Sequence, residues 1–147
     1  IIGDTLPEYE SYYNELKVKV EQYNLTKKIN FIGYQSDIKK YLEKSNFFIH
    51  CPIKPDPLPT VIFEAIESNT PVIFTNLGGS YEILDSGKNG LAIDHLSIKK
   101  SVESILKFLD NSFEQEKNIK NAKSYVEKNF QINSFNNSLK TLISKIV

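Results

Sequence analysis

The chain has 147 residues, of which 40% are hydrophobic, so it can bury one hydrophobic core but not two. Its 18 basic residues, all lysines, balance 18 acidic residues and are scattered along the sequence, which excludes the electrostatic footprint of a nucleic-acid-binding protein. The single cysteine, Cys51, excludes an internal disulfide, and no apolar run approaches the roughly 20 residues of a membrane-spanning helix. These features predict one cytoplasmic domain.

Short apolar runs of strand length alternate with longer segments of helical period over the first 50 residues. In chain order, the predicted elements are a strand at 1–2, a helix beginning near 7, a strand at 29–32, a short helix around 38–42 and a strand at 47–50. Gly3 and Gly33 end the first two strands. A loop with four prolines, from Pro52 to Pro59, follows the third strand.

The alternation continues beyond this loop. The predicted elements are a helix at 60–68, a strand at 71–74, a short helix opened by 76–80, a turn at 86–90, a strand at 91–93 and helices from 97 to the end. Strands that alternate with helices in this way are typical of a doubly wound, Rossmann-like α/β fold, with a parallel sheet covered by helices on both faces. We therefore predict a single α/β domain over residues 1–147.

Ligands of open α/β sheets bind beyond the carboxyl ends of the strands, and two carboxylates lie in such a place here. Asp56 lies in the proline-rich loop and Glu64 lies eight positions later, inside the following helix. Free amides of the first helical turn, at Thr60 and Val61, together with the helix dipole, form a seat for a diphosphate. Glu64, about one turn further in, could then accept hydrogen bonds from a ribose, and Asp56 would face sugar hydroxyls.

A purely structural interpretation of these residues stays open, and spacing alone favours it. Glu64 would then only complement the helix dipole, and Asp56 would shape a turn between prolines. Gly78 and Gly79, which precede a second helix start, are a secondary candidate for an anion seat.

The remaining chemistry-bearing residues give a weaker signal. No pair of histidine, cysteine or carboxylate residues has the spacing of metal ligands, so no metal site is predicted. His50 and His95 are interpreted as structural or surface groups. Cys51 is adjacent to His50, but neighbouring strand residues point to opposite faces, which argues against a nucleophile pair.

Several motifs agree in order and spacing with one family. They are Ile1-Ile-Gly-Asp4, Ile29-Asn-Phe-Ile-Gly33, the acidic pair Asp56 to Glu64 followed by Ala65 and Thr70-Pro-Val-Ile73, Thr75-Asn-Leu-Gly-Gly-Ser-Tyr-Glu82, and Asp85-Ser-Gly-Lys-Asn-Gly90. With these motifs, nearly the whole chain resembles the C-terminal nucleotide-sugar-binding lobe of GT-B glycosyltransferases, in particular family 4, the glycosyl transferases group 1 domain.

The resemblance implies a role for each candidate residue. Glu64 would bind the ribose, Asp56 with Leu58 and Pro59 would contact the donor sugar, and Thr60 and Val61 with Gly3 would hold the diphosphate. Gly33 and Tyr34 would meet the base. Asn69 stands where the family often has glycine, which is tolerable because asparagine adopts the left-handed conformation at a helix end.

The resemblance also implies parts that this sequence lacks. The first strand of the lobe, with basic residues that stabilise the leaving diphosphate, and the N-terminal acceptor-binding lobe would precede Ile1. That strand would lie at the centre of the sheet, so this segment should leave a gap there or borrow a strand, and by itself it should be inactive.

The resemblance therefore implies a hexosyltransferase-type enzyme that transfers a sugar, with retention and without a metal or cofactor, to a glycan or lipid-linked acceptor in polysaccharide or glycolipid synthesis. The helix at 98–109 leaves open a peripheral contact with the inner face of the membrane. Two alternatives are a nucleotide-sugar 2-epimerase of the same fold and a non-catalytic α/β binding module. Receiver modules cluster acidic residues after their first strand, where Asp4 is alone, so the last alternative is least favoured.

Overall fold

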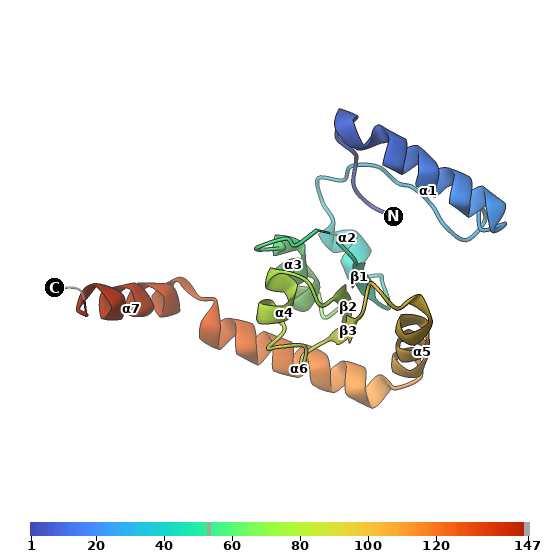
Figure 1. The fold of residues 1–147 in the computed structure, drawn as a ribbon. Helices are drawn as coiled ribbons and strands as arrows, with labels where there is room; N and C mark the ends of the chain where they lie inside the picture. Colours follow the sequence, from blue (N-terminus) through green and yellow to red (C-terminus); the bar gives the residue numbers. More distant parts are fainter. Residues whose placement is uncertain (53, 146–147) are drawn as a thin grey trace. The chain divides into compact units, whose positions relative to one another are not determined.

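The computed structural model describes residues 1–52 and 54–145 (Figure 1). The chain divides into two compact units, residues 1–38 and residues 39–147, and each is described by itself.

The first unit contains a short 3-10 helix, η1 (Pro7–Tyr9), and helix α1 (Glu10–Gln22). Its two predicted strands meet as one isolated parallel bridge between Ile2 and Gly33, where the Gly3 amide donates to the Gly33 carbonyl oxygen over 3.0 Å. No residue in this fully described stretch is buried. The predicted strands at 1–2 and 29–32 are therefore reduced to a single bridge.

The second unit is built on a parallel sheet of strands β1 (Phe48–His50), β2 (Val72–Thr75) and β3 (Leu91–Ile93), in the order β1-β2-β3. All four residues of β2 are buried, as expected for the central strand of a sheet covered on both faces. The free edge of β1 has no strand partner among the described residues.

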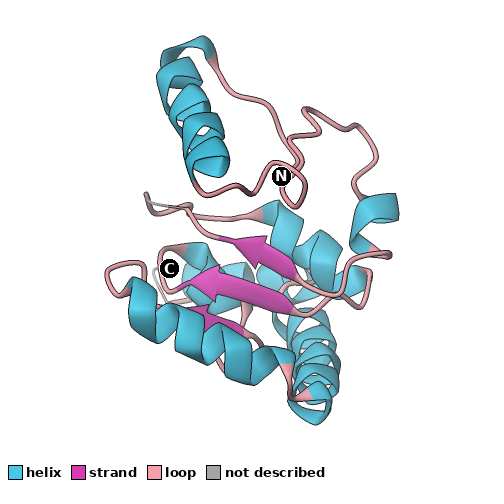
Figure 2. Cartoon of the chain, turned by 90° about the vertical axis from the view of Figure 1, so that its right-hand side faces the viewer, coloured by secondary structure: helices cyan, strands magenta, loops and turns pink. Residues whose placement is uncertain are grey.

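Helices connect and cover the strands. They are α2 (Lys39–Leu42), α3 (Thr60–Glu67), α4 (Gly79–Ile83), α5 (Ile98–Leu109), α6 (Ser112–Asn129) and α7 (Ile132–Ile143). Helices α3 and α4 connect successive parallel strands and lie on one face of the sheet, whereas α5 lies on the other, in front of the sheet in Figure 2. The predicted parallel α/β fold with helices on both faces is confirmed.

The hydrophobic core lies between this sheet and its helices. Its buried apolar residues among those described are Leu42, Ile62, Ala65, Ile66, Val72, Ile73, Phe74, Ile83, Leu84, Phe108 and Ala122. Strands β1 and β2 both run toward the segments that carry the predicted site, because the loop 52–59 follows β1 and the segment 76–79 follows β2. The core thus holds these two segments at the same edge of the sheet.

The end of α3 confirms one detail of the sequence analysis. Asn69 has φ = 59° just after the helix, and the Thr70 amide donates to the Ala65 carbonyl oxygen over 2.9 Å while the Asn69 amide donates to the Ile66 carbonyl oxygen. This pair of bonds is a Schellman motif, which requires a left-handed residue at this position. Asparagine supplies that conformation in place of glycine.

Candidate functional site

Two hydrogen bonds tie the loop that carries Asp56 to the end of β2 and the segment after it, and a third lies within the loop. The Thr75 hydroxyl, at the end of β2, donates to the Pro52 carbonyl oxygen over 3.2 Å. The Gly79 amide donates to the Asp56 carbonyl oxygen over 2.8 Å, and the Asp56 carboxylate accepts from the Leu58 amide over 3.1 Å. Asp56 is half-buried, so its carboxylate has a defined direction but is still reachable from solvent.

Helix α3 begins with unpaired amides immediately after this loop. Pro59, which is buried, precedes the helix and its carbonyl oxygen accepts from the Ile62 amide over 3.0 Å. Among residues 1–52 and 54–145 no hydrogen-bond partner is present for the amides of Thr60 and Val61. Thr60 is exposed and Val61 half-buried, so the unpaired amides lie at the surface, where the positive end of the helix dipole attracts an anion.

Glu64 lies about one helical turn further along α3 and is exposed. Its neighbours Ala65 and Ile66 are buried in the core, which fixes the orientation of the helix. Within the described part of the chain, no cation forms an ion pair with the Glu64 carboxylate. A carboxylate with this exposure can accept hydrogen bonds from a ligand diol.

Gly78 and Gly79 face the loop backbone. A Cβ atom on Gly78 would overlap the Asp56 carbonyl oxygen, and one on Gly79 would overlap the Pro57 carbonyl oxygen. Because the Gly79 amide is already bonded to Asp56, this amide is not free for an anion in the structure. The glycines allow the close approach that the sequence suggested, but the approaching group is the protein's own loop.

Three candidate residues lie in the first unit. Gly3 has φ = 124° and Gly33 has φ = 76°, a conformation that disfavours side chains at both positions. The Gly3 amide is bonded to the Gly33 carbonyl oxygen, which brings the two glycines together, and Tyr34 is largely exposed. A base-binding role for Gly33 and Tyr34 stays a prediction, as does a diphosphate-binding role for Gly3.

The sequence analysis did not single out two polar atoms at this edge. Among the described residues, His50 Nε2 and Ser80 Oγ are the buried side-chain atoms without a hydrogen-bond partner. His50 stacks on Phe48 at 6.1 Å, and burial lowers its pKa, an effect that the negative charge of Asp56 opposes. Burial thus favours the neutral form of the His50 imidazole, while the nearby Asp56 favours the charged form.

Cys51, next to His50, has no activating surroundings. Desolvation raises the pKa of its thiol, so the thiolate form is disfavoured. This supports the interpretation that Cys51 is not a nucleophile.

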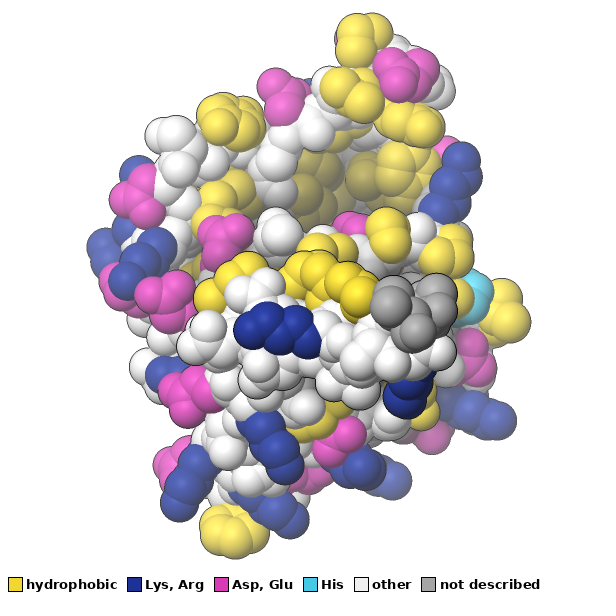
Figure 3. All heavy atoms as spheres, turned by 90° about the vertical axis from the view of Figure 1, so that its left-hand side faces the viewer, with side chains coloured by type: hydrophobic (Ala, Val, Ile, Leu, Met, Phe, Trp, Pro, Cys, Tyr) yellow, Lys and Arg dark blue, Asp and Glu magenta, His cyan; other side chains and the backbone are white. Residues whose placement is uncertain are grey.

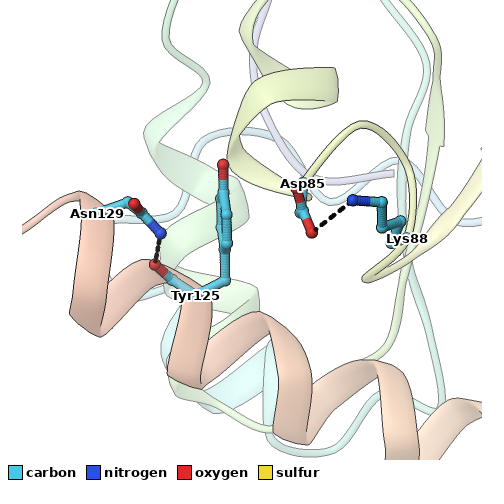
Figure 4. Close-up of polar contacts among 4 residues, drawn as sticks. All are labelled: Asp85, Lys88, Tyr125 and Asn129. Carbon is cyan, nitrogen blue, oxygen red and sulfur yellow. Dashed lines mark hydrogen bonds and ion pairs between the residues drawn. The ribbon is translucent and has the colours of Figure 1, made fainter.

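The Asp85 to Gly90 segment forms a tight turn, shown in Figure 4. Asp85 and Ser86 have φ of 50° and 57°, and Lys88 Nζ lies 3.2 Å from Asp85 Oδ2. Figure 4 also shows Asn129 at the end of α6, whose side-chain amide donates to the Tyr125 carbonyl oxygen over 2.8 Å. Both interactions are local to their own element, and the exposed ion pair contributes little stability.

Charged side chains of both signs are mixed on the surface, and the described residues contain no cluster of metal ligands. Figure 3 shows lysines and acidic side chains interspersed on the face that it draws. No group of three histidine, cysteine or carboxylate side chains that could hold a metal ion occurs in residues 1–52 and 54–145. Over the same residues, no helix has both the length and the hydrophobicity of a membrane span.

Comparison with known proteins gives one consistent family. The family model described as "Glycosyl transferases group 1" matches residues 1–125. Spore coat protein SA of Bacillus subtilis is 33% identical over 105 residues, which are 69% of this chain and 28% of that protein. The chain therefore spans little more than a quarter of the length of this curated relative.

Solved structures share the fold. Anabaena Alr3699/HepE, crystallised in complexes with UDP and with UDP-glucose, matches with a TM-score of 0.83 for the UDP complex, at 22% identity, over 98% of this chain and 40% of that chain. The C-terminal domain of a glycosyl transferase group 1 family protein (LpcC) from Francisella tularensis matches with a TM-score of 0.71 at 25% identity, over 86% of this chain and 66% of that chain.

Proposed function

Because this chain belongs to the glycosyl transferases group 1 family, we propose that it is the donor-binding part of a glycosyltransferase that uses a nucleotide-diphosphate sugar. One observation carries the proposal: α3 begins with unpaired amides at Thr60 and Val61, with Asp56 before them and the exposed Glu64 within the helix. A nucleotide-diphosphate sugar carries its negatively charged diphosphate between the hydroxyls of the ribose and those of the donor sugar. This order matches a carboxylate, free amides and a second carboxylate.

Each group in the site then has a separate task. In the second unit, the amides of Thr60 and Val61 hold the diphosphate. Glu64 accepts hydrogen bonds from the ribose, while Asp56, with Leu58 and Pro59, contacts the donor sugar. A diphosphate role for Gly3 and base contacts of Gly33 and Tyr34, all in the first unit, rest on the family motifs alone. We derive these roles from the family motifs and from the exposure of the residues in the second unit.

The chemical step in the proposal is transfer of the sugar to a glycan or lipid-linked acceptor with retention of configuration. The main electrostatic task is stabilisation of the departing diphosphate, and the amides at the start of α3 supply part of it without a metal. Since the chain spans 40% of the Anabaena structure, we propose that the acceptor lobe and the basic residues belong to other parts of the full-length protein.

The nucleotide that we propose to test first is UDP, because the Anabaena protein was crystallised with UDP and with UDP-glucose. The expected product is a cell-surface polysaccharide or a glycolipid made at the cytoplasmic side of the membrane.

We also propose that α5 makes a peripheral membrane contact. Its exposed apolar stripe consists of Ile98, Val102, Leu106 and Leu109. Ile98 is 79% exposed, and α5 carries three lysines that can reach anionic headgroups. Sedimentation of the protein with anionic vesicles, but not with neutral ones, is expected. Ile98→Asp, which places a charge in the exposed apolar stripe, should lose sedimentation with the anionic vesicles. If the parent protein does not sediment with anionic vesicles, the contact is refuted.

Thermal denaturation of the full-length protein with UDP-, GDP- and ADP-sugars tests the donor site. A ligand at 100 times its Kd stabilises the folded state by about 2.7 kcal/mol, which raises Tm by several degrees. We expect one nucleotide series to raise Tm and Glu64→Ala to reduce the rise. If no nucleotide sugar changes Tm and Glu64→Ala leaves activity intact, the proposed site is wrong. Release of epimerised donor in the absence of an acceptor would instead favour the 2-epimerase.

A further inference from the structure

We propose that Gly78 and Gly79 are positioning residues that set the place of the Asp56 carboxylate, and this proposal rests on the proposed function of the donor site. By sequence alone, these glycines are a secondary candidate for an anion seat. Their surroundings in the structure point to a mechanical task instead, because they contact the backbone of the loop from two adjacent positions.

A side chain on either glycine would collide with the backbone of the Asp56 loop. A Cβ atom on Gly78 would overlap the Asp56 carbonyl oxygen and lie 2.8 Å from the Asp56 amide nitrogen. A Cβ atom on Gly79 would overlap the Pro57 carbonyl oxygen and lie 2.8 Å from the Pro57 carbonyl carbon. Backbone atoms cannot turn aside as a flexible side chain can, so any larger residue must move the loop.

The backbone conformation of Gly78 and a hydrogen bond from Gly79 also hold the loop. Gly78 has φ = 63° and ψ = −151°, a combination that is essentially restricted to glycine. This conformation aims the next amide, that of Gly79, at the Asp56 carbonyl oxygen, where it makes the 2.8 Å hydrogen bond. The two glycines therefore hold the Asp56 backbone both by contact and by a hydrogen bond.

The position of the Asp56 carboxylate depends on the backbone of its loop. The Asp56 carboxylate is tied to the Leu58 amide of the same loop, so the side chain moves with its backbone. A displacement of about 1 Å in a group that contacts a substrate can lower the rate by about 100-fold. Gly78 and Gly79 thus act on the donor sugar through Asp56 without touching it.

The experiment compares Gly78→Ala and Gly79→Ala with the control Gly90→Ala in the full-length enzyme. A Cβ on Gly90 would lie 2.9 Å from the Val72 carbonyl oxygen, which is also tight but belongs to the packing against β2. We expect kcat/KM for the donor to fall by about tenfold or more in the first two variants. The control should stay within about twofold, even where it lowers Tm by the same amount. An equal loss in all three variants overturns the proposal.

A double-mutant cycle with Asp56→Asn separates this proposal from the proposed function. If Gly79 acts through Asp56, Gly79→Ala has little further effect on kcat/KM in the Asp56→Asn background, and full additivity overturns the positioning role. If Asp56→Asn itself leaves donor kinetics unchanged, the donor site is wrong, whichever result the glycine variants give.

Where the alanine variants fail to fold, the unaltered full-length enzyme still gives an answer. Hydrogen exchange is measured with and without saturating UDP-glucose or whichever nucleotide sugar raises Tm. Slower exchange on donor binding at both 56–58 and 78–80 is the expected result, since the two segments are bonded to each other. Slowing at 56–58 alone overturns the proposal.

Discussion

The hydroxyl of Thr70 donates a 2.9 Å hydrogen bond to the carbonyl oxygen of Leu42, across 28 positions of sequence. Thr70 is only 2% exposed, so water cannot replace this bond. The bond ties the end of α3, which carries the candidate ribose-binding glutamate, to the end of α2.

Loss of this bond should destabilise the fold. Thr70→Val keeps the shape but leaves the Leu42 carbonyl without its donor, so we expect the free energy of unfolding to fall by about 1–2 kcal/mol. The matched control is Thr141→Val, because the Thr141 hydroxyl makes a bond of the same 2.9 Å length to the Asn137 carbonyl oxygen at an exposed site. Urea denaturation of both variants measures the difference, and equal effects would show that burial of the bond is unimportant.

The left-handed backbone conformation of Asn69 should make the stability of the fold sensitive to the residue type at this position. Asn69→Ala places a methyl side chain at φ = 59° and should lower the free energy of unfolding by about 1 kcal/mol. Asn69→Gly relieves the steric constraint and should stay within about 0.5 kcal/mol of the parent. Urea denaturation of the two variants measures their free energies of unfolding. An alanine variant as stable as the glycine variant would contradict this expectation.

Glu64 should affect donor use without affecting stability. Removal of an exposed carboxylate changes the free energy of unfolding by less than about 0.5 kcal/mol. Loss of a charged acceptor for the ribose lowers kcat/KM for the donor by about 10- to 100-fold. Glu67→Ala, also exposed and on the same helix, is the control and should keep normal donor kinetics. Similar kinetics in both variants would remove Glu64 from the site.

His50 makes stability depend on pH in a defined direction. Burial lowers its pKa below the ordinary value of 6.5, with opposition from Asp56. Below that value the unfolded chain takes up a proton on His50 that the folded protein resists. The unfolded state then binds more protons, so the free energy of unfolding decreases as the pH is lowered. Above it, the full stability is present.

The measurement for His50 is urea denaturation at about pH 8 and about pH 5.5. We expect the parent protein to lose more stability between these values than His50→Gln, which has no titrating group there. An unchanged pH dependence in His50→Gln would mean that another group causes it.

The regular part of the fold was predictable because its signals are local. Segment 71–74 is a run of apolar residues between turn signals, and it forms the buried strand β2 with a shift of one residue. Segment 60–68 has helical period and forms α3. The segments 1–2 and 29–32 have the same kind of pattern, but they form one isolated bridge, Ile2 to Gly33, with a few backbone hydrogen bonds around it in place of regular strands. Pairing depends on neighbouring strands, which a local pattern does not report.

The candidate site residues follow from the sequence, whereas their contacts do not, and their roles toward a ligand stay predictions. Among the described residues the amides of Thr60 and Val61 have no hydrogen-bond partner and Glu64 is exposed, so these groups are open to a ligand. The partner of Gly79 did not follow from the sequence, because a glycine pair signals close approach without naming what approaches. The orphaned Nε2 of His50 likewise depends on tertiary packing, which places an imidazole next to the loop only in the folded chain.

The strand order β1-β2-β3 follows the chain order, and this has a consequence for how the protein is made. Phe48 pairs with Val72 and Ile73 with Leu91, so each strand joins one that was synthesised about two dozen residues or fewer before it. Contacts of such modest sequence separation have a low entropic cost of loop closure. As the chain leaves the ribosome, every new strand of this sheet therefore meets a partner that has already emerged.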